Sequence, residues 1–312
     1  MTACGKAARA GRPGDDDAAT DRGRDAPCVS VVIPVLDAAA WIDDQLRALA
    51  AQQVPVPWEV VVADNGSTDG TTALALAWRD RLPVRVVDAS EVRDINHARN
   101  RGTEEACGEL LLFCDGDDMV HPDWVAAYWR TRDEWDVAGG KVETTTLNDP
   151  VALARTPQER ERGLATFGWM PTFMGCNFAV HRGVHRAIGG FDETFLGGCD
   201  DIDFAFRAQL SGHRLGYVPE AVVAYRVRGR LRDAARQYFR YGHTRAHLYR
   251  KFKAWGMPRR TLRHTLRTYA LTVVHVPQLL RADGRARWIV QAAFLVGMLT
   301  GSLHDHTFYL SE

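Results

Sequence analysis

A five-residue apolar run, Leu110–Cys114, ends abruptly in the acidic turn Asp115-Gly116-Asp117-Asp118. A short apolar run closed by a glycine-containing turn is typical of a buried strand. Because alternate residues of an extended chain project to the same side, Asp115 and Asp117 can face one point in space. Two hard carboxylates at the end of a buried strand suit Mg²⁺ or Mn²⁺. An acidic surface turn is the alternative that this stretch alone leaves open.

Strands and helices alternate before and around this run. Strands are expected near residues 29–35, 59–63, 84–88 and 109–114, and helices near 37–52, from 69 onward and near 95–106. Asp37 is expected to cap the first helix, which has an apolar stripe of Trp41, Ile42, Leu46 and Leu49. This alternation predicts an α/β fold with parallel strands. In such sheets ligands bind beyond the carboxyl ends of the strands, so Pro34-Val35, Asp64 and the acidic turn should meet there.

The composition is that of a globular protein without a metal–thiol or disulfide framework. With 312 residues, 46% of them hydrophobic, the chain can bury a sizeable core. Its six cysteines are scattered without a C-x-x-C pair, which favours reduced thiols in the cytosol over zinc or disulfides. Residues 1–27 lack an apolar segment, so a disordered tail is expected rather than a signal peptide.

Seven short motifs, in order and at matching spacing, resemble those of the family 2 glycosyltransferases. They are VSVVIPVL (29–36), VVADNGSTDG (61–70), HARNRG (97–102), LFCDGDD (112–118), GCNF (175–178), GGFDE (189–193) and DDID (200–203). The resemblance covers about residues 29–225. It implies a GT-A fold, in which a Rossmann-like nucleotide-binding half with a mixed, mainly parallel sheet joins an acceptor-binding half, here followed by C-terminal helices.

On the donor side, the resemblance implies that Asp64 hydrogen-bonds the pyrimidine base, with a turn-stabilising contact as the alternative. Arg99 is expected to contact the donor or a neighbouring aspartate. Asp117 would bind the Mg²⁺ or Mn²⁺ that bridges the phosphates, and Asp115 would reach the ribose or the metal. Asp118 is expected near a helix N-terminus rather than on the metal. The implied donor-binding residues are Pro34, Val35, Asp64, Asn65, Arg99 and Asp115, and the implied metal ligands are Asp115 and Asp117.

On the acceptor side, Asp201 matches the family's catalytic base, which would take the proton from an acceptor hydroxyl in a single, inverting displacement. Asp200 stands where the family usually has glutamate, so its contacts are open, although it is expected in the same pocket. Ordinary capping at a helix N-terminus is the alternative for this acidic pair. Asn177 resembles a residue that lines the donor-sugar or acceptor pocket, and a buried asparagine that pairs with backbone groups is equally compatible with the sequence.

The C-terminal region is basic and then apolar. From Arg226 to Arg267 there are fourteen arginines and lysines against one acid, with aromatic residues between them. Such a stretch could lie on an anionic membrane or bind a lipid-linked phosphate, or it could be a solvated helical face. Nucleic acid is not expected, because no nucleic-acid-binding motif accompanies it. Trp288–Leu303 carries no charge but is short for a membrane span, so a helix packed on the domain or at the membrane surface is expected.

The sequence therefore predicts a tail (1–27), a GT-A domain (28–228, with a nucleotide-sugar half, 28–120, and an acceptor half, 121–228) and a helical region (229–312). The predicted function is a metal-dependent, inverting glycosyltransferase in the cytoplasm at the inner face of the membrane. By resemblance its donor would be a UDP-sugar, and its acceptor a glycan, glycolipid or lipid-linked molecule. A sugar-phosphate nucleotidyltransferase would need a glycine- and arginine-rich loop with a lysine after the first strand, which residues 36–40 lack. A non-catalytic sugar-nucleotide or glycan-binding module is the rival outside the enzymes.

Overall fold

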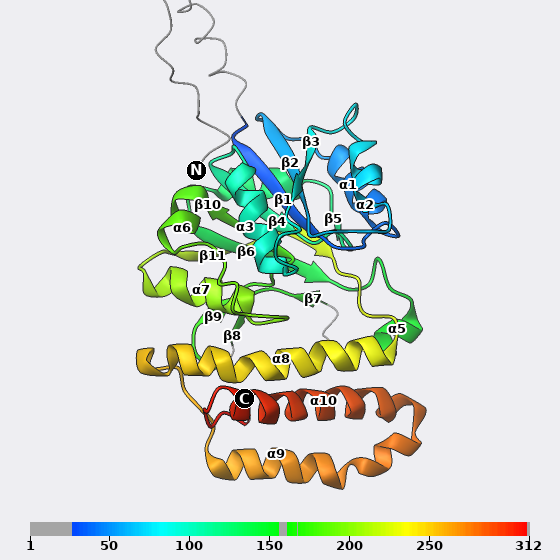
Figure 1. Cartoon of the computed structure of the whole chain (residues 1–312), viewed down its shortest axis with the longest axis vertical. Coiled ribbons are helices and arrows are strands. Elements are labelled where there is room, and N and C mark those ends of the chain that lie inside the picture. The colour runs from blue at the N-terminus through cyan, green and yellow to red at the C-terminus, as the bar shows by residue number, and fades with distance from the viewer. Residues whose placement is uncertain (1–26, 156–160, 167, 311–312) are drawn as a thin grey trace, which may run out of the picture.

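The computed structural model describes residues 27–155, 161–166 and 168–310. The predicted tail therefore lies almost entirely outside the described residues. A nine-stranded sheet forms the centre of the molecule, in the order β3-β2-β1-β4-β10-β6-β11-β5, with β7 added beside β6 (Figure 1). Its strands are β1 Val29–Val35, β2 Trp58–Asp64, β3 Val84–Asp88, β4 Leu110–Cys114, β5 Met119–Val120, β6 Val137–Glu143, β7 Glu161–Arg162, β10 Asn177–His181 and β11 Leu215–Ala224. Two short strands, β8 Ala165–Thr166 and β9 Pro171–Thr172, form a separate ribbon.

The first half of the sheet is parallel, as the alternation of strands and helices predicts. β1 pairs in parallel with both β2 and β4, and β2 pairs in parallel with β3. Every residue of β1 and β4 is buried, which explains their unbroken apolar sequences, since a strand covered on both faces has no polar side. The carboxyl ends of these strands consequently lie along one edge of the sheet.

The second half of the sheet is mixed. β10 runs antiparallel to both β4 and β6, whereas β11 is parallel to β6 and antiparallel to the short β5. Pairing of β11 with β5 brings the end of β11 beside the acidic turn, because β5 begins at Met119, directly after that turn. The second half thus contributes its own chain segments to the edge where the first four strands end.

Helices cover both faces of the sheet, and three more extend below it (Figure 1). They are α1 Ile42–Ala50, α2 Thr71–Leu76, α3 Ile95–Glu105, α4 Trp124–Thr131, α5 Pro150–Arg155, α6 Arg182–Ala187, α7 Asp200–Leu210, α8 Leu231–Phe252, α9 Leu262–Val274 and α10 Ala282–His304, with 3-10 turns η1 Lys253–Trp255 and η2 Val276–Leu280. One core lies between the sheet and α1, α2 and α4. A second core, rich in stacked phenylalanines, lies under α6 and α7.

The expected cap of the first helix is wrong. Asp37 does not begin a helix; it has φ 50°, and α1 starts five residues later at Ile42. The Asp37 carboxylate instead accepts from the backbone N–H of Thr68 at 2.8 Å, and the N–H of Asp37 donates to Ser67 Oγ at 2.9 Å. The apolar stripe of Ile42, Leu46 and Leu49 is buried as predicted, whereas Trp41 is exposed. The loop after β1 is therefore fastened to the loop after β2.

The C-terminal helices are packed in a stack, with α8 between the sheet domain and α10, and α9 beyond α10 (Figure 1). α8 and α10 approach at three glycines: a methyl group on Gly242 would overlap the Phe294 carbonyl, one on Gly297 that of Phe239, and one on Gly301 that of His243. Small residues four apart allow helix backbones to touch in this way. The apolar stretch 288–303 therefore forms a helix, α10, that packs through its glycine-containing face on α8, in line with the expected packing on the rest of the protein.

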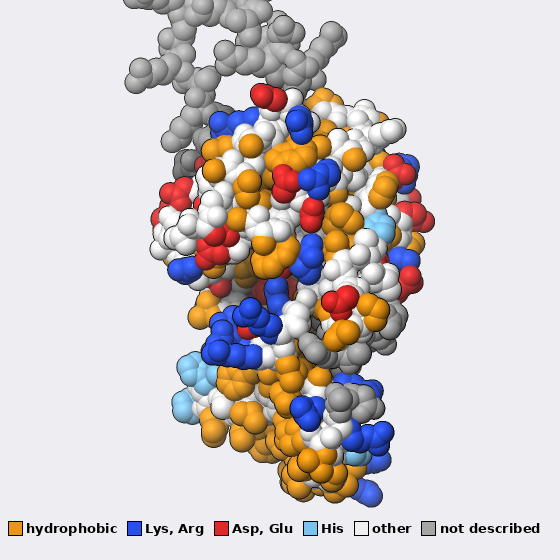
Figure 2. All heavy atoms as spheres, turned by 90° about the vertical axis from the view of Figure 1, so that its right-hand side faces the viewer, with side chains coloured by type: hydrophobic (Ala, Val, Ile, Leu, Met, Phe, Trp, Pro, Cys, Tyr) orange, Lys and Arg blue, Asp and Glu red, His pale blue; other side chains and the backbone are white. Residues whose placement is uncertain are grey.

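The outer surface of the helical stack is apolar. Exposed hydrophobic side chains on α9, η2 and α10 include Leu266, Val273, Val274, Leu280, Val296, Leu299 and Leu303. Figure 2 shows this surface as the largely hydrophobic lower part of the molecule, with basic side chains beside it. Within the described residues, the segment Gly284–His304 is long and apolar enough to cross a membrane by length and composition alone.

Candidate active site

An open cleft of about 1580 Å³ lies at the carboxyl edge of the sheet, between the sheet domain and α8. Figure 2 shows it as a hollow at mid-height, with acidic side chains inside it and basic side chains along its lower edge. The ends of β1 and β4, the loop before α7, the loop after β11 and one face of α8 all line it. Eight of the predicted site residues line this cleft: Pro34, Val35, Asn65, Arg99, Asp115, Asp117, Asp200 and Asp201.

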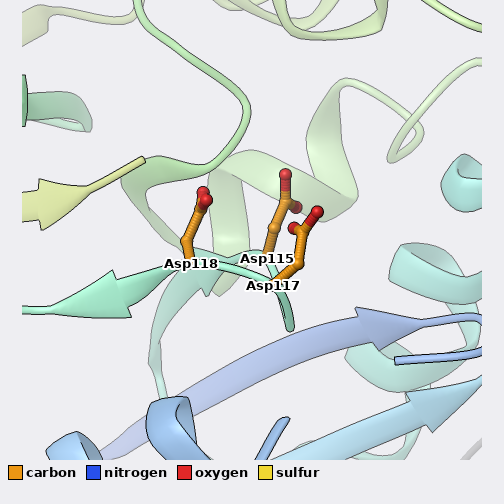
Figure 3. Close-up of side chains that lie close together, drawn as sticks. All are labelled: Asp115, Asp117 and Asp118. Atoms are coloured by element: carbon orange, nitrogen blue, oxygen red, sulfur yellow. The ribbon is translucent and has the colours of Figure 1, made fainter. Parts of the chain in front are cut away.

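Three carboxylates gather in the turn between β4 and β5. One oxygen from each of Asp115, Asp117 and Asp118 can be chosen so that all lie within 4.8 Å of one another, and the three side chains point to the same side of the turn (Figure 3). Burial and the neighbouring charges of Asp117 and Asp115 raise the pKa of Asp118 well above its usual range. Its Oδ2 atom is buried without a hydrogen-bond partner in the described structure. This crowding of negative charge favours a bound cation.

The prediction that Asp118 lies near a helix N-terminus is therefore wrong. No helix begins at Asp118; the strand β5 follows it, and its Oδ1 accepts from the backbone N–H of Arg226 at 2.8 Å. Asp118 is 1% exposed, so its carboxylate faces the other two aspartates rather than solvent. Local sequence favoured a cap because an aspartate often precedes a helix, and only the pairing of β5 with β11 overrides that preference.

Two arginines that follow β11 hold the acidic turn. Arg226 Nε donates to the backbone carbonyl of Asp117 at 2.9 Å, and Arg228 Nη1 lies 2.7 Å from Asp117 Oδ2. From the other side, Gln45 of α1 donates to the carbonyl of Asp115 and accepts from the N–H of Val120. The turn is thus fixed by contacts from α1 and from the chain after β11.

Arg99 joins the two acidic centres of the cleft. It extends from α3 and is 2% exposed; its Nη1 lies 2.5 Å from Asp200 Oδ2, and its Nη2 lies 3.3 Å from Asp115 Oδ1. The same Nη2 donates to the Gly175 carbonyl at 3.2 Å. The expected contact of Arg99 with a neighbouring aspartate is therefore present. Because a buried charge is costly without partners, this guanidinium keeps Asp115 and Asp200 together.

Asp201 lies in the first turn of α7 and faces the cleft. Its Oδ2 accepts from the N–H of Gly175 at 2.9 Å, and its Oδ1 from the N–H of Ile202 at 2.8 Å. Burial, and then the charge of Asp200, raise the pKa of Asp201 to about 6. A carboxylate with such a pKa is a better proton acceptor than an ordinary aspartate and is still ionised at neutral pH. The glycines before α7 permit its approach, with φ 92° at Gly197.

The predicted base-binding side lies at the ends of β2 and β3. Asp64 lines a smaller hollow of about 470 Å³ next to Asp88 and Ser90. Its two oxygens accept from the N–H of Ser67 and from Thr72 Oγ1, which is the turn-stabilising contact weighed as the alternative. The side-chain amide of Asn65 donates through Nδ2 to the backbone carbonyls of Ala89 and Val92. Asn65 therefore fixes the loop after β3.

Asn177 is not a pocket residue, which corrects the sequence prediction. Its side chain is fully buried; Nδ2 donates to the carbonyls of Lys141 and Ala221, and Oδ1 accepts from Trp124 Nε1 and Tyr128 Oη, all at 2.8 Å. The residue joins α4 to the middle of the sheet beneath the cleft. The equally weighted alternative, a buried asparagine that pairs with backbone groups, is the one found.

The sequence of this chain matches families of known proteins. Residues 30–189, just over half of the chain, match the family described as Glycosyl transferase family 2. The chain belongs to this family. Residues 110–303 also match Glycosyl transferase family group 2, which extends the likeness into the C-terminal helices. The chain is therefore a glycosyltransferase, as its motifs predict.

Relatives and solved structures agree with this assignment. Glycosyltransferase AglE of Haloferax volcanii is 29% identical over 79% of each chain, and the succinoglycan biosynthesis protein ExoA of Rhizobium meliloti is 27% identical over 72% of this chain and 71% of its own. The mannosyltransferase PcManGT of Pyrobaculum calidifontis, solved with GDP-Man and Mn²⁺, superposes with a TM-score of 0.59 at 22% identity, over 88% of this chain and 87% of its own. TarS of S. aureus with UDP-GlcNAc gives 0.53 at 19%, over 90% and 93%. The predicted GT-A fold is confirmed.

Sequence reasoning missed Arg228 as an individual residue. It was counted only within the basic stretch that starts at Arg226, yet its guanidinium pairs with Asp117, 111 positions earlier in the chain. The single local signal was the alternation of arginines at 226, 228 and 230 directly after an apolar strand, which is the pattern of an extended segment with one charged side. Nothing in the sequence indicates which carboxylate this segment meets.

Proposed function

We propose that this glycosyltransferase transfers a sugar from a nucleoside diphosphate sugar, a UDP-sugar first among them, to an acceptor hydroxyl in a metal-dependent, inverting reaction. The proposal is carried by one observation. Asp201, a partly buried carboxylate with a pKa of about 6, shares a cleft with Asp115 and Asp117 of the three-aspartate cluster. Such a pair of sites suits a reaction in which one end accepts a proton and the other receives a leaving diphosphate.

A divalent cation fits the acidic turn. Carboxylate oxygens are the ligands that Mg²⁺ and Mn²⁺ prefer, and Asp118 Oδ2 is a buried acceptor without a hydrogen-bond partner in the described structure. Asp115 and Asp117 would hold the ion as predicted, and Asp118, which sequence reasoning left out, would join them. When bound, the cation would neutralise the charge that develops on the departing diphosphate. The Mn²⁺ named with PcManGT supports the same choice of ion.

The chain's own groups would carry the rest of the reaction. Asp201 would accept the proton as the acceptor oxygen bonds to the anomeric carbon, while the bond from that carbon to the phosphate oxygen breaks and the diphosphate leaves with the electron pair. Gly175 orients the Asp201 carboxylate through its N–H. Arg228, paired with Asp117 at 2.7 Å, lies where a guanidinium can also donate to a diphosphate. A single displacement on the face opposite the leaving group inverts the configuration.

Donor identity is proposed from the smaller hollow and the solved neighbours. The hollow next to Asp64 is bounded by the ends of β2 and β3, and a carboxylate there can accept from the ring N–H of uracil or thymine. Pro34 and Val35 at the end of β1 would lie against the nucleoside. UDP-GlcNAc and UDP are named with TarS and GDP-Man with PcManGT, so several nucleotides remain in the test.

The acceptor and the location are proposed from the helical stack and the relatives. ExoA is named for succinoglycan biosynthesis, which supports a growing polysaccharide, glycolipid or lipid-linked acceptor at the cytoplasmic face of a membrane. The exposed apolar residues of α9, among them Leu262, Leu266 and Val273, share that helix with the exposed Arg263 and Arg267. Apolar side chains with basic neighbours suit the headgroup region of an anionic bilayer.

The membrane contact can be measured with vesicles. The protein should cosediment with vesicles that contain 30% phosphatidylglycerol and stay in solution with pure phosphatidylcholine. Replacing Arg263 and Arg267 with glutamine should weaken the anionic binding, whereas Arg130→Gln on the exposed part of α4 should not. Equal binding to both kinds of vesicle would show that the basic residues do not contribute to membrane binding. Binding to neither kind would contradict the proposed membrane contact.

The transferase proposal is tested by Mn²⁺-dependent hydrolysis of UDP-, GDP- and dTDP-sugars. Slow release of one nucleoside diphosphate, lost in Asp117→Ala and much reduced in Asp201→Asn, is the expected result. Metal-dependent binding without any release, even with candidate acceptors, would favour the non-catalytic binding module. Formation of a nucleotide sugar from a sugar phosphate and a nucleoside triphosphate would instead show a nucleotidyltransferase.

A further inference from the structure

A row of arginines on α8 faces the acidic residues across the cleft. Arg236 and Arg240 are one helical turn apart, both are exposed, and both line the cleft together with Arg230, which directly precedes α8. Among the described residues, no carboxylate lies within ion-pair distance of Arg236 or Arg240, although Asp233 lines the same cleft. We refer to Arg230, Arg236 and Arg240 as the arginine wall.

The arginine wall has a fixed position relative to the proposed base. The stem of Arg240 packs on Gly197, where an added Cβ would lie 3.0 Å from Arg240 Cδ, and Gly197 precedes Asp201 by four residues. Thr244, one turn after Arg240, donates to Cys199 Sγ at 3.2 Å. α8 therefore packs directly on the loop that presents Asp201, so a group bound to the wall has a defined relation to the base.

The cleft has more room than a donor requires. Its volume of about 1580 Å³ exceeds the roughly 300–1,000 Å³ of an ordinary small-molecule site. The acidic turn and the end of β1 are at one side, and α8 with Gln291 and Phe294 of α10 at the other. A donor whose diphosphate is held at the acidic turn would leave the α8 side for the acceptor.

We propose that the arginine wall binds a phosphate group of the acceptor, a conclusion that rests on the proposed transferase function. Guanidinium groups bind phosphate through paired, charge-assisted hydrogen bonds. Asp200 and Asp201 repel the same anion from the opposite side. An acceptor with a phosphate is therefore turned in one direction, with its phosphate at α8 and its hydroxyl at Asp201. A neutral glycan could accept hydrogen bonds from these arginines but would lack the charge pairing that makes a phosphate the stronger ligand.

The test is a calorimetric titration of phosphate monoesters into protein saturated with Mn²⁺ and UDP, so that the donor side is filled. Dodecyl phosphate, below its micelle concentration, represents a lipid phosphate, and glycerol 3-phosphate represents a phosphate within a soluble glycan. Arg236→Gln/Arg240→Gln should weaken binding of the esters at least tenfold. The lysine pair Arg236→Lys/Arg240→Lys keeps the charge and should recover part of the affinity, and Arg130→Gln on α4, the same change of charge away from the cleft, should have no effect.

The outcomes separate the two proposals. Tighter binding of dodecyl phosphate identifies a lipid-linked phosphate, and equal binding of the two esters identifies a phosphate in the glycan. Absence of ester binding to the wild type, or equal binding by wild type and the glutamine pair, overturns the arginine wall. Failure of Mn²⁺ and UDP to bind the wild type contradicts the proposed function instead, and the ester titration without nucleotide still decides the role of the wall.

Discussion

Replacing Arg99 with glutamine is expected to destabilise the fold, because it leaves the buried Asp200 and the partly buried Asp115 without their cation. Arg99 contacts Asp200 at 2.5 Å and Asp115 at 3.3 Å, and the three side chains are 3%, 12% and 25% exposed. Breaking a buried ion pair by removing one partner costs about 3–5 kcal/mol. Since Asp115 is a quarter exposed and can regain some hydration, we expect a loss near the lower end, about 3 kcal/mol.

The loss should depend on pH in a direction that the structure fixes. Burial raises the pKa of Asp115, and Arg99 is the largest influence that holds that pKa down. Without Arg99 the pKa of Asp115 in the folded protein rises further above its unfolded value of about 3.9. A carboxyl whose folded pKa is raised costs stability at high pH and costs little once both states are protonated. The difference between wild type and Arg99→Gln should therefore be larger at pH 8 than at pH 5.

The assay is urea unfolding, followed by tryptophan fluorescence in EDTA at pH 5, 6.5 and 8. Arg101→Gln is the matched control, because Arg101 lies on the same helix, is 30% exposed and pairs with Glu104 and Glu105 on the surface. Such a pair is worth about 1 kcal/mol or less. If Arg99→Gln cost no more than Arg101→Gln, or cost the same at pH 5 and pH 8, the account of Arg99 as the counter-charge of Asp115 and Asp200 would be wrong.

Three further outcomes follow from other contacts. Because the pKa of Asp201 is about 6 and a base must be ionised, donor turnover should fall about tenfold per unit below pH 6; nucleoside diphosphate release measured from pH 5 to 8 would show this, and a flat profile would exclude Asp201 as the base. Asn177→Leu should cost at least about 3 kcal/mol in urea unfolding, since it strands several buried partners at about 1–3 kcal/mol each, while the folded fraction keeps its Mn²⁺–UDP affinity. Gly301→Ala should cost about 1–3 kcal/mol by overpacking α10 against α8, whereas Gly183→Ala, with open space around its Cβ position, should not; equal melting temperatures would contradict the close helix contact.

The sequence allowed prediction of those features that depend on short segments and their order. The four parallel strands, the helices between them and the meeting of the end of β1 with Asp115 and Asp117 at one edge follow from alternation and from the rule that parallel strands end together. The place of Asp201 in the same cleft is expected only from the family resemblance. The errors concern side chains whose partners are distant in sequence. Asp118 is held beside the other two carboxylates by the backbone N–H of Arg226, 108 positions away. Asn177 is buried because α4 and β6 close over it, which no local pattern indicates.

If both the donor and the acceptor carry phosphate, the cleft must bind each of them at its own end. The distribution of charge along the cleft can provide this selectivity. At the acidic turn an anion is repelled by Asp115, Asp117 and Asp118 unless a divalent cation is held there, so under the proposed function a diphosphate would bind at that place only with metal. At the α8 side the positive charge belongs to Arg236 and Arg240 themselves, and binding there depends on no ion. A nucleoside diphosphate gains from the metal and the two hollows together, whereas a phosphate monoester gains only from the arginines. The two ends of the cleft can therefore select different phosphates, with Asp201, the proposed base, between them.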